Sequence, residues 1–213
     1  MENFEMKTRR FLMFCALAGL AVLSSGCGYN TLTTQHENVK AKWANVETQL
    51  QRRNDLLNNL TEAAKMAGVQ EQEVFGKIAE ARSKLINAQN QAPQGEGNDK
   101  SPEQKQAVID AANSFGGTIG RLLVLQEQYP NLKSNENFLK LQDEVSGTEN
   151  RIATARKDYN DAAQEYNTTR ARFPTVVSAK LFGFGEEPYY KADEGANQVP
   201  KLDSNTLRPN QNK

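Results

Sequence analysis

Reactive side chains are scarce in this chain of 213 residues, which contains one histidine and two cysteines. These numbers leave too few groups for a zinc site, a thiol nucleophile or a histidine-based catalytic triad. The 26 Lys and Arg residues balance the 26 Asp and Glu residues, so the basic excess that nucleic-acid binding requires is also missing. We therefore predict no enzyme activity, no cofactor or metal site, and no nucleic-acid partner.

The N-terminus is typical of a secretory leader. Lys7, Arg9 and Arg10 form a positively charged start, and residues 11–23 follow without any charge. This run of thirteen residues is shorter than the roughly 20 that span a bilayer, and its length fits the apolar part of a signal peptide. We predict that residues 1–26 are a signal peptide.

A cysteine lies where cleavage of this leader is expected. Residues 23–27 (LSSGC) resemble the lipobox of bacterial lipoproteins, although Ser24 stands where that pattern usually has Leu. The resemblance implies cleavage after Gly26 and a diacylglyceryl thioether on Cys27, carrying fatty acids such as palmitate. The alternatives are an ordinary secretory signal with a chance cysteine, and an uncleaved short anchor.

A lipid on Cys27 would also determine the location of the protein, because two or more acyl chains hold a protein stably at a membrane. Cys15 would leave with the leader, so the mature chain would have no intrachain disulfide. Gly28 follows Cys27, and in Gram-negative lipoproteins the absence of Asp at this position usually accompanies outer-membrane sorting. We predict a membrane-anchored lipoprotein on the periplasmic or other extracytoplasmic side, with the outer membrane as one candidate and the choice between inner and outer membrane left open.

Apolar residues recur at spacings of three and four along four segments, as in helices that bury one face. The segments are about residues 32–67, 70–91, 101–129 and 138–173. Ser101, Pro102 and Gln104 together form a helix start with a capping box, and Ser134 is a candidate cap for the last helix. Residues 91–100 contain no large apolar side chain and predict an exposed loop.

Four long helices with short connections predict an all-α fold, an antiparallel up-and-down bundle. Gly116 and Gly120 lie one turn apart and predict a close helix crossing. Residues 176–190 carry an apolar group that we interpret as a short C-terminal helix and a segment sealing the bundle, with a partner contact as the alternative. The predicted domains are the signal peptide 1–26, the bundle 27–190 and a disordered tail 191–213.

Two long stretches of the sequence resemble the LemA family. They are Gly28–Leu57, which contains the sequences GYNTL, ENV and QRRNDLL, and Gly120–Asn160, which contains GRLL, YPNLKSNENF, GTENRI and ARKDYN. The resemblance covers about residues 28–190, and Asn58 departs from the proline that the family usually has. It implies a helical bundle tethered to a bacterial membrane, with most of the chain outside the cytoplasm. It implies no catalytic residues.

A polar layer is predicted inside the bundle, because Arg53 interrupts the apolar seam of the first helix. Antiparallel pairing of the first and last helices places Arg53 opposite residues 148–151, which are Thr148, Glu149, Asn150 and Arg151. A buried Arg needs a carboxylate or several acceptors to offset the cost of desolvation. We therefore expect Arg53 near Glu149 or Thr148. The layer is interpreted as a register pin for the helices, with a ligand or partner site as the alternative.

The remaining polar and aromatic residues are given structural interpretations. His36 is expected to be an exposed helix residue, and Glu186 and Glu187 are expected to be solvated. The function predicted from the whole sequence is a non-catalytic scaffold or interaction protein of the envelope, anchored to the membrane by its lipid and docking an unidentified envelope protein. The alternative is a periplasmic module that binds a small ligand, or an accessory protein, at the layer around Arg53 and Glu149.

Overall fold

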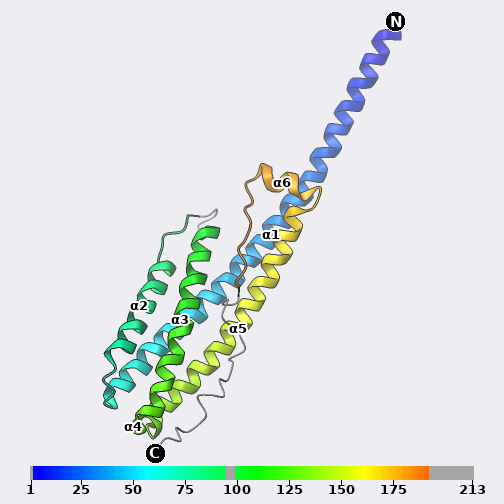
Figure 1. Ribbon diagram of the computed structural model, residues 1–213. Coiled ribbons are helices and arrows are strands. Elements are labelled where there is room, and N and C mark those ends of the chain that lie inside the picture. Colours follow the sequence, from blue (N-terminus) through cyan, green and yellow to red (C-terminus); the bar gives the residue numbers. More distant parts are fainter. Residues whose placement is uncertain (1, 95–98, 192–213) are drawn as a thin grey trace, which may run out of the picture.

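A computed structural model describes residues 2–94 and 99–191 of the chain, with side chains from Gly28 onward except at positions 123 and 133. The described part is all-helical, as predicted, and contains six helices (Figure 1). They are α1 (Glu2–Met66), α2 (Gln72–Gln89), α3 (Pro102–Gln128), α4 (Pro130–Lys133), α5 (Glu136–Ala171) and α6 (Thr175–Leu181). The proposed tail, apart from residue 191, lies outside the described residues.

The two longest helices, α1 and α5, lie along each other in opposite directions, and α2 packs against α3 (Figure 1). Their facing seams form one hydrophobic core, which includes the fully buried side chains of Leu50, Phe115 and Phe138. Trp43, Tyr159 and Tyr166 are buried as well and belong to the same core. Most of the free energy of folding of such helices comes from burying these apolar faces.

Helix α3 begins as the local sequence predicts. The Ser101 hydroxyl accepts a hydrogen bond from the Gln104 N–H at 3.3 Å, and the Ser101 N–H donates to Gln104 Oε1 at 3.0 Å. Gln104 also donates from Nε2 to the Ala92 carbonyl at 2.8 Å and accepts from the Gln94 N–H at 3.1 Å. One side chain therefore caps the helix and closes the preceding loop against it.

Three details differ from the sequence predictions. Pro130 does not simply end α3 but opens the one-turn helix α4, because its fixed φ suits the first helical position. Asn135, rather than Ser134, caps α5 by accepting a hydrogen bond from the Phe138 N–H at 3.1 Å. The close crossing predicted at Gly116 and Gly120 is wrong, because an added methyl at Gly120 would meet nothing within 4 Å.

The first helix is much longer than the predicted 32–67, because it continues without a break from Glu2 to Met66. The chain turns away just after Met66, at Gly68, whose φ of 88° lies in the left-handed region that glycine favours. Among the described residues, no helix combines the length and the apolar character needed to cross a membrane. The side chains of the proposed signal peptide, including that of Cys15, lie outside the described ones.

Candidate functional site

The site is built around residues 182–191, which follow α6 and which we call the strap. The strap crosses the bundle beside α5, and Asn167 of α5 binds its backbone at Glu187. The Asn167 Nδ2 donates to the Glu187 carbonyl at 2.8 Å, and the Glu187 N–H donates back to Asn167 Oδ1 at 3.0 Å. Both residues are buried, so these bonds replace contacts with water that the strap has lost.

The same pattern occurs two helical turns earlier on α5. Asn160 donates from Nδ2 to the Tyr190 carbonyl at 2.9 Å and accepts from the Tyr190 N–H at 2.8 Å. Asn160 and Asn167 are seven residues apart, so they lie on the same face of α5. Each asparagine amide therefore pairs with one residue of the strap, much as a neighbouring strand would.

A tyrosine precedes each asparagine and adds one more bond to the strap. Tyr166 donates its hydroxyl to the Gly185 carbonyl at 2.8 Å, and Tyr159 donates to the Pro188 carbonyl at 2.7 Å. Burial, reinforced by the charge of Glu187, raises the pKa of Tyr159 well above its ordinary value, which keeps the hydroxyl protonated as a donor. The two Tyr-Asn pairs of α5, which we call the Tyr-Asn repeat, thus fix the path of the strap.

The strap places a carboxylate beside a buried ammonium. Lys105 of α3 is fully buried, and its Nζ lies 2.9 Å from Glu187 Oε2 and 3.1 Å from Glu187 Oε1. The same Nζ lies 2.8 Å from Oδ2 of Asp99, just before α3. Two carboxylates from distant parts of the chain therefore neutralise one ammonium, which offsets the cost of burying the three charges.

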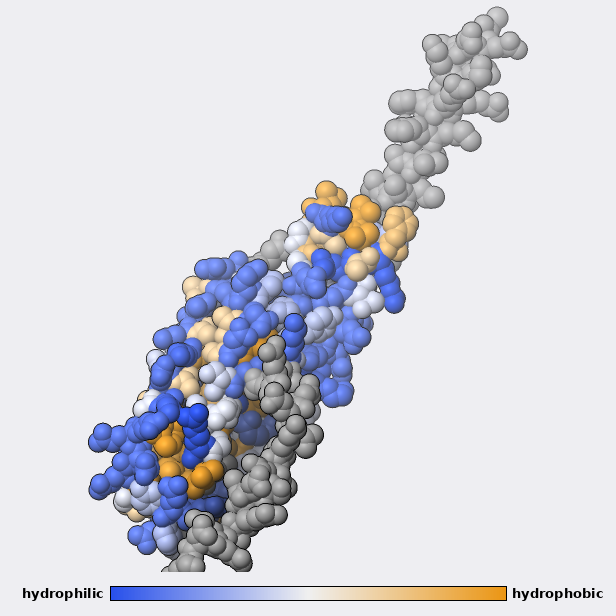
Figure 2. Space-filling model, in the orientation of Figure 1, coloured by the Kyte–Doolittle hydropathy of each residue, from blue (hydrophilic) through white to orange (hydrophobic). Residues whose placement is uncertain are grey.

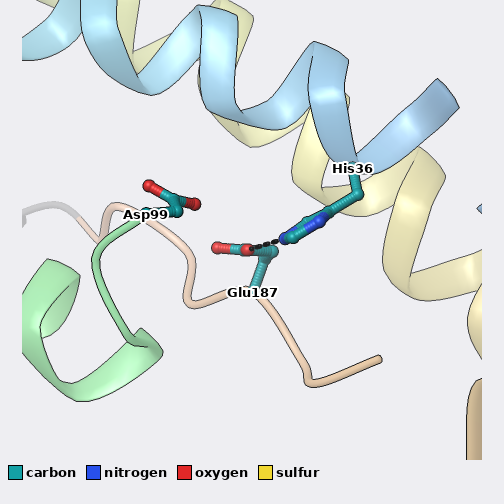
Figure 3. A group of neighbouring side chains, drawn as sticks. All are labelled: His36, Asp99 and Glu187. Carbon is teal, nitrogen blue, oxygen red and sulfur yellow. Dashed lines mark hydrogen bonds and ion pairs between the residues drawn. The ribbon is translucent and has the colours of Figure 1, made fainter. Parts of the chain in front are cut away.

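His36 of α1 completes this group. Its Nε2 lies 3.1 Å from Glu187 Oε1 (Figure 3). Its ring also stacks on that of Tyr166, with the centroids 5.3 Å apart. The prediction that His36 is exposed is wrong, because only 17% of its side chain is accessible. The prediction that Glu187 is solvated is also wrong, because its residue is 4% exposed. Glu186 does lie at the surface, where it pairs with Arg170 at 2.9 Å.

The charge state of Glu187 follows from these neighbours. Burial favours the neutral acid, but the hydrogen bond with His36 and the charge of Lys105 outweigh burial and lower the pKa of Glu187. The carboxylate is therefore ionised at neutral pH. Lys105, Asp99, Glu187 and His36 form what we call the latch, because they tie the strap to α3 by ion pairs and to α1 by the hydrogen bond of His36.

The latch borders a hollow of about 210 Å³, lined in part by Lys100, Ser101 and Phe184. Ligand atoms of His36, Asp99 and Glu187 all lie within 4.8 Å of one another, which is within reach of one metal ion (Figure 3). Lys105, however, already bonds both carboxylates, so a divalent cation would have to displace a buried ammonium. The ammonium of Lys105 therefore provides the positive charge beside the two carboxylates that a bound metal ion would otherwise provide.

The predicted polar layer lies elsewhere in the bundle. Arg53 is fully buried, with its Nη1 3.4 Å from Glu149 Oε1 and its Nη2 donating to the Ala112 carbonyl at 2.8 Å. Its guanidinium also faces the Phe115 ring, 5.1 Å from the centroid. Burial lowers the pKa of Arg53, and the nearby Glu149 partly opposes that shift. A methyl added at Gly116 would lie 3.8 Å from Nη1, in ordinary van der Waals contact, so the guanidinium does not require a glycine there.

The other members of the predicted layer do not join Arg53. Thr148 is buried, and its hydroxyl has no hydrogen-bond partner among the described residues. Asn150 and Arg151 lie at the surface and line a separate hollow of about 320 Å³ together with Asn45 and Gln49. Arg53 does not line that hollow. The side chain of Cys27, the predicted lipidation site, lies outside the described residues.

The latch was not predicted from the sequence. Asp99 and Lys100 fall in the segment predicted to be an exposed loop, yet both are partly buried. One signal was present: within the last long helical segment the dipeptide Tyr-Asn recurs at a spacing of seven residues, at 159 and 166. Asparagine on the buried side of a helix needs partners for its amide, so this repeat indicates that another backbone packs there.

The fold and the site define a class: all-helical proteins in which a C-terminal strap is fastened across the two longest helices. Comparison with known proteins agrees with the resemblance found in the sequence. Residues 42–203, more than half of the chain, match the LemA family. The chain belongs to the LemA family.

Individual relatives are moderately similar. Magnetosome protein MamQ 2 of Paramagnetospirillum magneticum is 30% identical over 175 residues, which cover 76% of this chain and 64% of that protein. Magnetosome protein MamQ of Magnetospirillum gryphiswaldense is 27% identical over 174 residues, with the same two shares. Protein LemA of Metamycoplasma hominis is 29% identical over 137 residues, 64% of this chain and 54% of that protein. The chain spans less than two thirds of the length of these curated relatives.

Proposed function

We propose that this protein is a non-catalytic scaffold or interaction protein of the bacterial cell envelope, held at a membrane by a lipid on Cys27. Its body would be an antiparallel up-and-down bundle of four long helices that displays a docking surface to an envelope partner. In this proposal the body lies on the extracytoplasmic side of the membrane. Gly28, and not Asp, follows the cysteine, as is usual in Gram-negative lipoproteins sorted to the outer membrane.

One observation carries the non-catalytic part of this proposal: the most reactive group of side chains is fully engaged in holding the strap. Lys105 bonds both Asp99 and Glu187, and His36 bonds Glu187. A general acid or base needs a free position within hydrogen-bond reach of a substrate. In the latch, the ammonium of Lys105 is fully buried and Glu187 is 4% exposed. The two groups bond each other, so neither has a free position for a substrate.

The alternative of a small-ligand module at Arg53 and Glu149 has less support. The guanidinium of Arg53 is fully buried against Ala112 and Phe115, which leaves it no surface for an incoming molecule. Glu149, in contrast, keeps 39% of its side chain accessible. This arrangement favours the register-pin interpretation of the layer.

The tether is tested by growing the bacterium with an alkyne analogue of palmitate and attaching a fluorophore to the isolated protein. We expect the full-length chain to be labelled and Cys27→Ser to be unlabelled. Cys15→Ser is the matched control, because it removes the other cysteine, and it should be labelled like the unaltered chain. Equal labelling of Cys27→Ser, or no labelling of either chain, would contradict the tether.

The scaffold role is tested separately by photo-crosslinking in intact cells. A photoreactive residue is placed at an exposed position on α1, α5 or the strap of the lipidated protein. We expect one envelope protein to be captured in an amount comparable to the bait from one of these surfaces. Turnover of a substrate that a single side-chain change abolishes would instead contradict a non-catalytic role.

A further inference from the structure

The apolar residues after α5 divide into a covered group and an uncovered one. Ser178, Ala179 and Tyr190 are buried against the bundle. Four neighbours are exposed, and we call them the apolar cap. They are Phe173, Val177, Leu181 and Phe182, with 85%, 55%, 73% and 46% of each residue accessible. Large apolar side chains gathered at one place on a surface mark a contact with another apolar phase.

The position of the apolar cap is fixed by contacts between α6 and α1. A methyl added at Gly28 would lie 3.3 Å from Ser178 Oγ and 3.5 Å from Thr175 Cγ2, so α6 packs directly on this part of α1. Tyr29, the next residue, packs edge-on against Phe182 with the ring centroids 4.8 Å apart. The apolar cap is therefore level with Cys27, the residue that the lipobox resemblance assigns to the anchor.

The figures agree with this placement. Helix α6 lies at the end of the bundle where α1 continues toward its N-terminus (Figure 1). Apolar surface gathers at that end, and a second apolar patch lies near the opposite end, with hydrophilic surface over much of the visible face between them (Figure 2). A lipid attached at Cys27 would bring this end of the rod to the bilayer.

The charges around the apolar cap fit a lipid surface with anionic headgroups. Residues 172–182 contain two basic side chains, Arg172 and Lys180, and no acidic one. Both basic residues are exposed. Apolar residues flanked by Lys and Arg are the composition of helices that lie in the membrane interface, where the cations remain at the headgroups.

We propose that the apolar cap inserts into the surface of the membrane that carries the anchor, with Arg172 and Lys180 at the phosphate level. This inference rests on the proposed lipid tether and adds a second attachment to it. A single point of attachment leaves a rod free to pivot, whereas two attachments hold its axis at a set angle to the bilayer. The latch and the polar layer are then presented at a fixed distance from the membrane.

The test uses the full chain, purified from membranes and reconstituted into vesicles of phosphatidylethanolamine and phosphatidylglycerol. A fluorescent amino acid replaces Leu181, and brominated phospholipids serve as quenchers. Val124 of α3 is the matched control position, because it is 56% exposed but lies away from α6. We expect blue-shifted emission and quenching by bromine from position 181, and neither from position 124.

Two outcomes would overturn the insertion. Emission from position 181 that is neither shifted nor quenched would show that the apolar cap faces water. A blue shift without quenching would show that another protein, such as a second copy of the chain, covers it. Mass spectrometry of the same sample reports the lipid on Cys27. An acylated chain without quenching refutes the insertion alone, and a quenched chain without acylation refutes the tether alone.

A paired substitution gives a second readout. Val177→Asp with Leu181→Asp places two carboxylates among anionic headgroups, and Val124→Asp is the control for an added charge elsewhere. Quenching of a probe at Phe182 should fall by about tenfold or more in the double variant, because both the apolar contact and the charge match are lost. It should be unchanged by Val124→Asp, and helical circular dichroism reports whether each variant is folded. Unchanged quenching in a folded double variant would contradict the insertion.

Discussion

Arg53 and Lys105 are both fully buried cations, yet the chain neutralises them in different ways. Arg53 lies 3.4 Å from one carboxylate, and that carboxylate belongs to a residue with 39% of its side chain accessible. Lys105 lies within 3 Å of two carboxylates, Asp99 at 2.8 Å and Glu187 at 2.9 Å, whose side chains are 13% and 5% accessible. The first cation depends mainly on a carbonyl and a ring, and the second depends on opposite charges.

The difference shows what each group does for the fold. The contacts of Arg53 come from helices that pack together through their apolar seams, so the pin adds to an interface that is already formed. The contacts of Lys105 include Glu187, which lies 82 residues away and belongs to no helix. The latch therefore holds a segment outside the helices, in which Tyr190 and Phe184 pack on the core, and we expect its loss to lower stability more than the loss of the Arg53 contacts.

The largest effect is expected from Lys105→Met. This change leaves Asp99 and Glu187 close together and largely buried without their shared cation, and breaking a buried pair costs about 3–5 kcal/mol. Urea unfolding of the full chain, followed by circular dichroism, measures the loss. Adding Glu187→Gln to Lys105→Met should restore part of the stability, because it removes one of the two stranded charges. A decrease of under about 1 kcal/mol in the free energy of unfolding would contradict this expectation, because it would be no larger than the contribution of a surface ion pair.

A smaller loss is expected from Asn167→Ala, which removes both hydrogen bonds to the backbone of Glu187. Leaving a buried N–H and carbonyl unpaired costs about 2–3 kcal/mol in the free energy of unfolding. Asn150→Ala on the same helix is the matched control, because Asn150 is exposed and should change stability by under about 0.5 kcal/mol. Equal losses from the two variants would show that the strap does not depend on Asn167.

The latch should also contribute to acid sensitivity. The pKa of Glu187 is lowered in the folded chain, so its contribution to stability is present above the unfolded pKa and is lost as the pH falls through the folded pKa. Unfolding measured between about pH 6 and pH 3 should therefore show a steeper loss for the unaltered chain than for Glu187→Gln. Glu186→Gln, next to it but at the surface, should keep the steep loss. A slope unchanged by Glu187→Gln would contradict the assignment.

The smallest effect is expected from Arg53→Met. Met has a similar reach and no charge, and the freed Glu149 is accessible enough to be hydrated. Replacing a buried ion by an apolar side chain of similar size is often nearly neutral, so we expect a change within about 1 kcal/mol. The urea midpoint of this variant, measured beside that of Lys105→Met, compares the two cations directly. Equal losses of unfolding free energy in the two variants would show that the two buried cations stabilise the fold to the same extent, contrary to this prediction.

The parts of the fold that are coded locally were predictable. The start of α3 depends on Ser101 and Gln104, which are three residues apart, and both bonds of the box are formed. The position of Arg53 was visible as an interruption in an apolar seam, because a helix repeats its faces at a regular spacing. The one-turn helix α4 was not predicted, because a proline such as Pro130 is equally compatible with the end of one helix and the beginning of the next.

The latch could not be predicted in the same way. Lys105 falls on the buried face of α3, and its partners come from a loop and from the strap, which have no periodic pattern to align them. The Tyr-Asn repeat binds carbonyl and N–H groups, which every residue carries, so the strap has no matching side-chain pattern. Glu187 lies beside the exposed Glu186, and the sequence alone gives the two carboxylates the same appearance.

Because the Tyr-Asn repeat binds the backbone of the strap, exposed residues of the strap can be replaced by a foreign sequence. Tyr159, Asn160, Tyr166 and Asn167 contact main-chain atoms of residues 185, 187, 188 and 190, so this part of the attachment does not depend on the side chains of the strap. Residues 185, 186 and 189 are exposed. An antibody epitope encoded at those exposed positions, with Glu187 and Tyr190 kept, would be displayed on the side of the helical bundle.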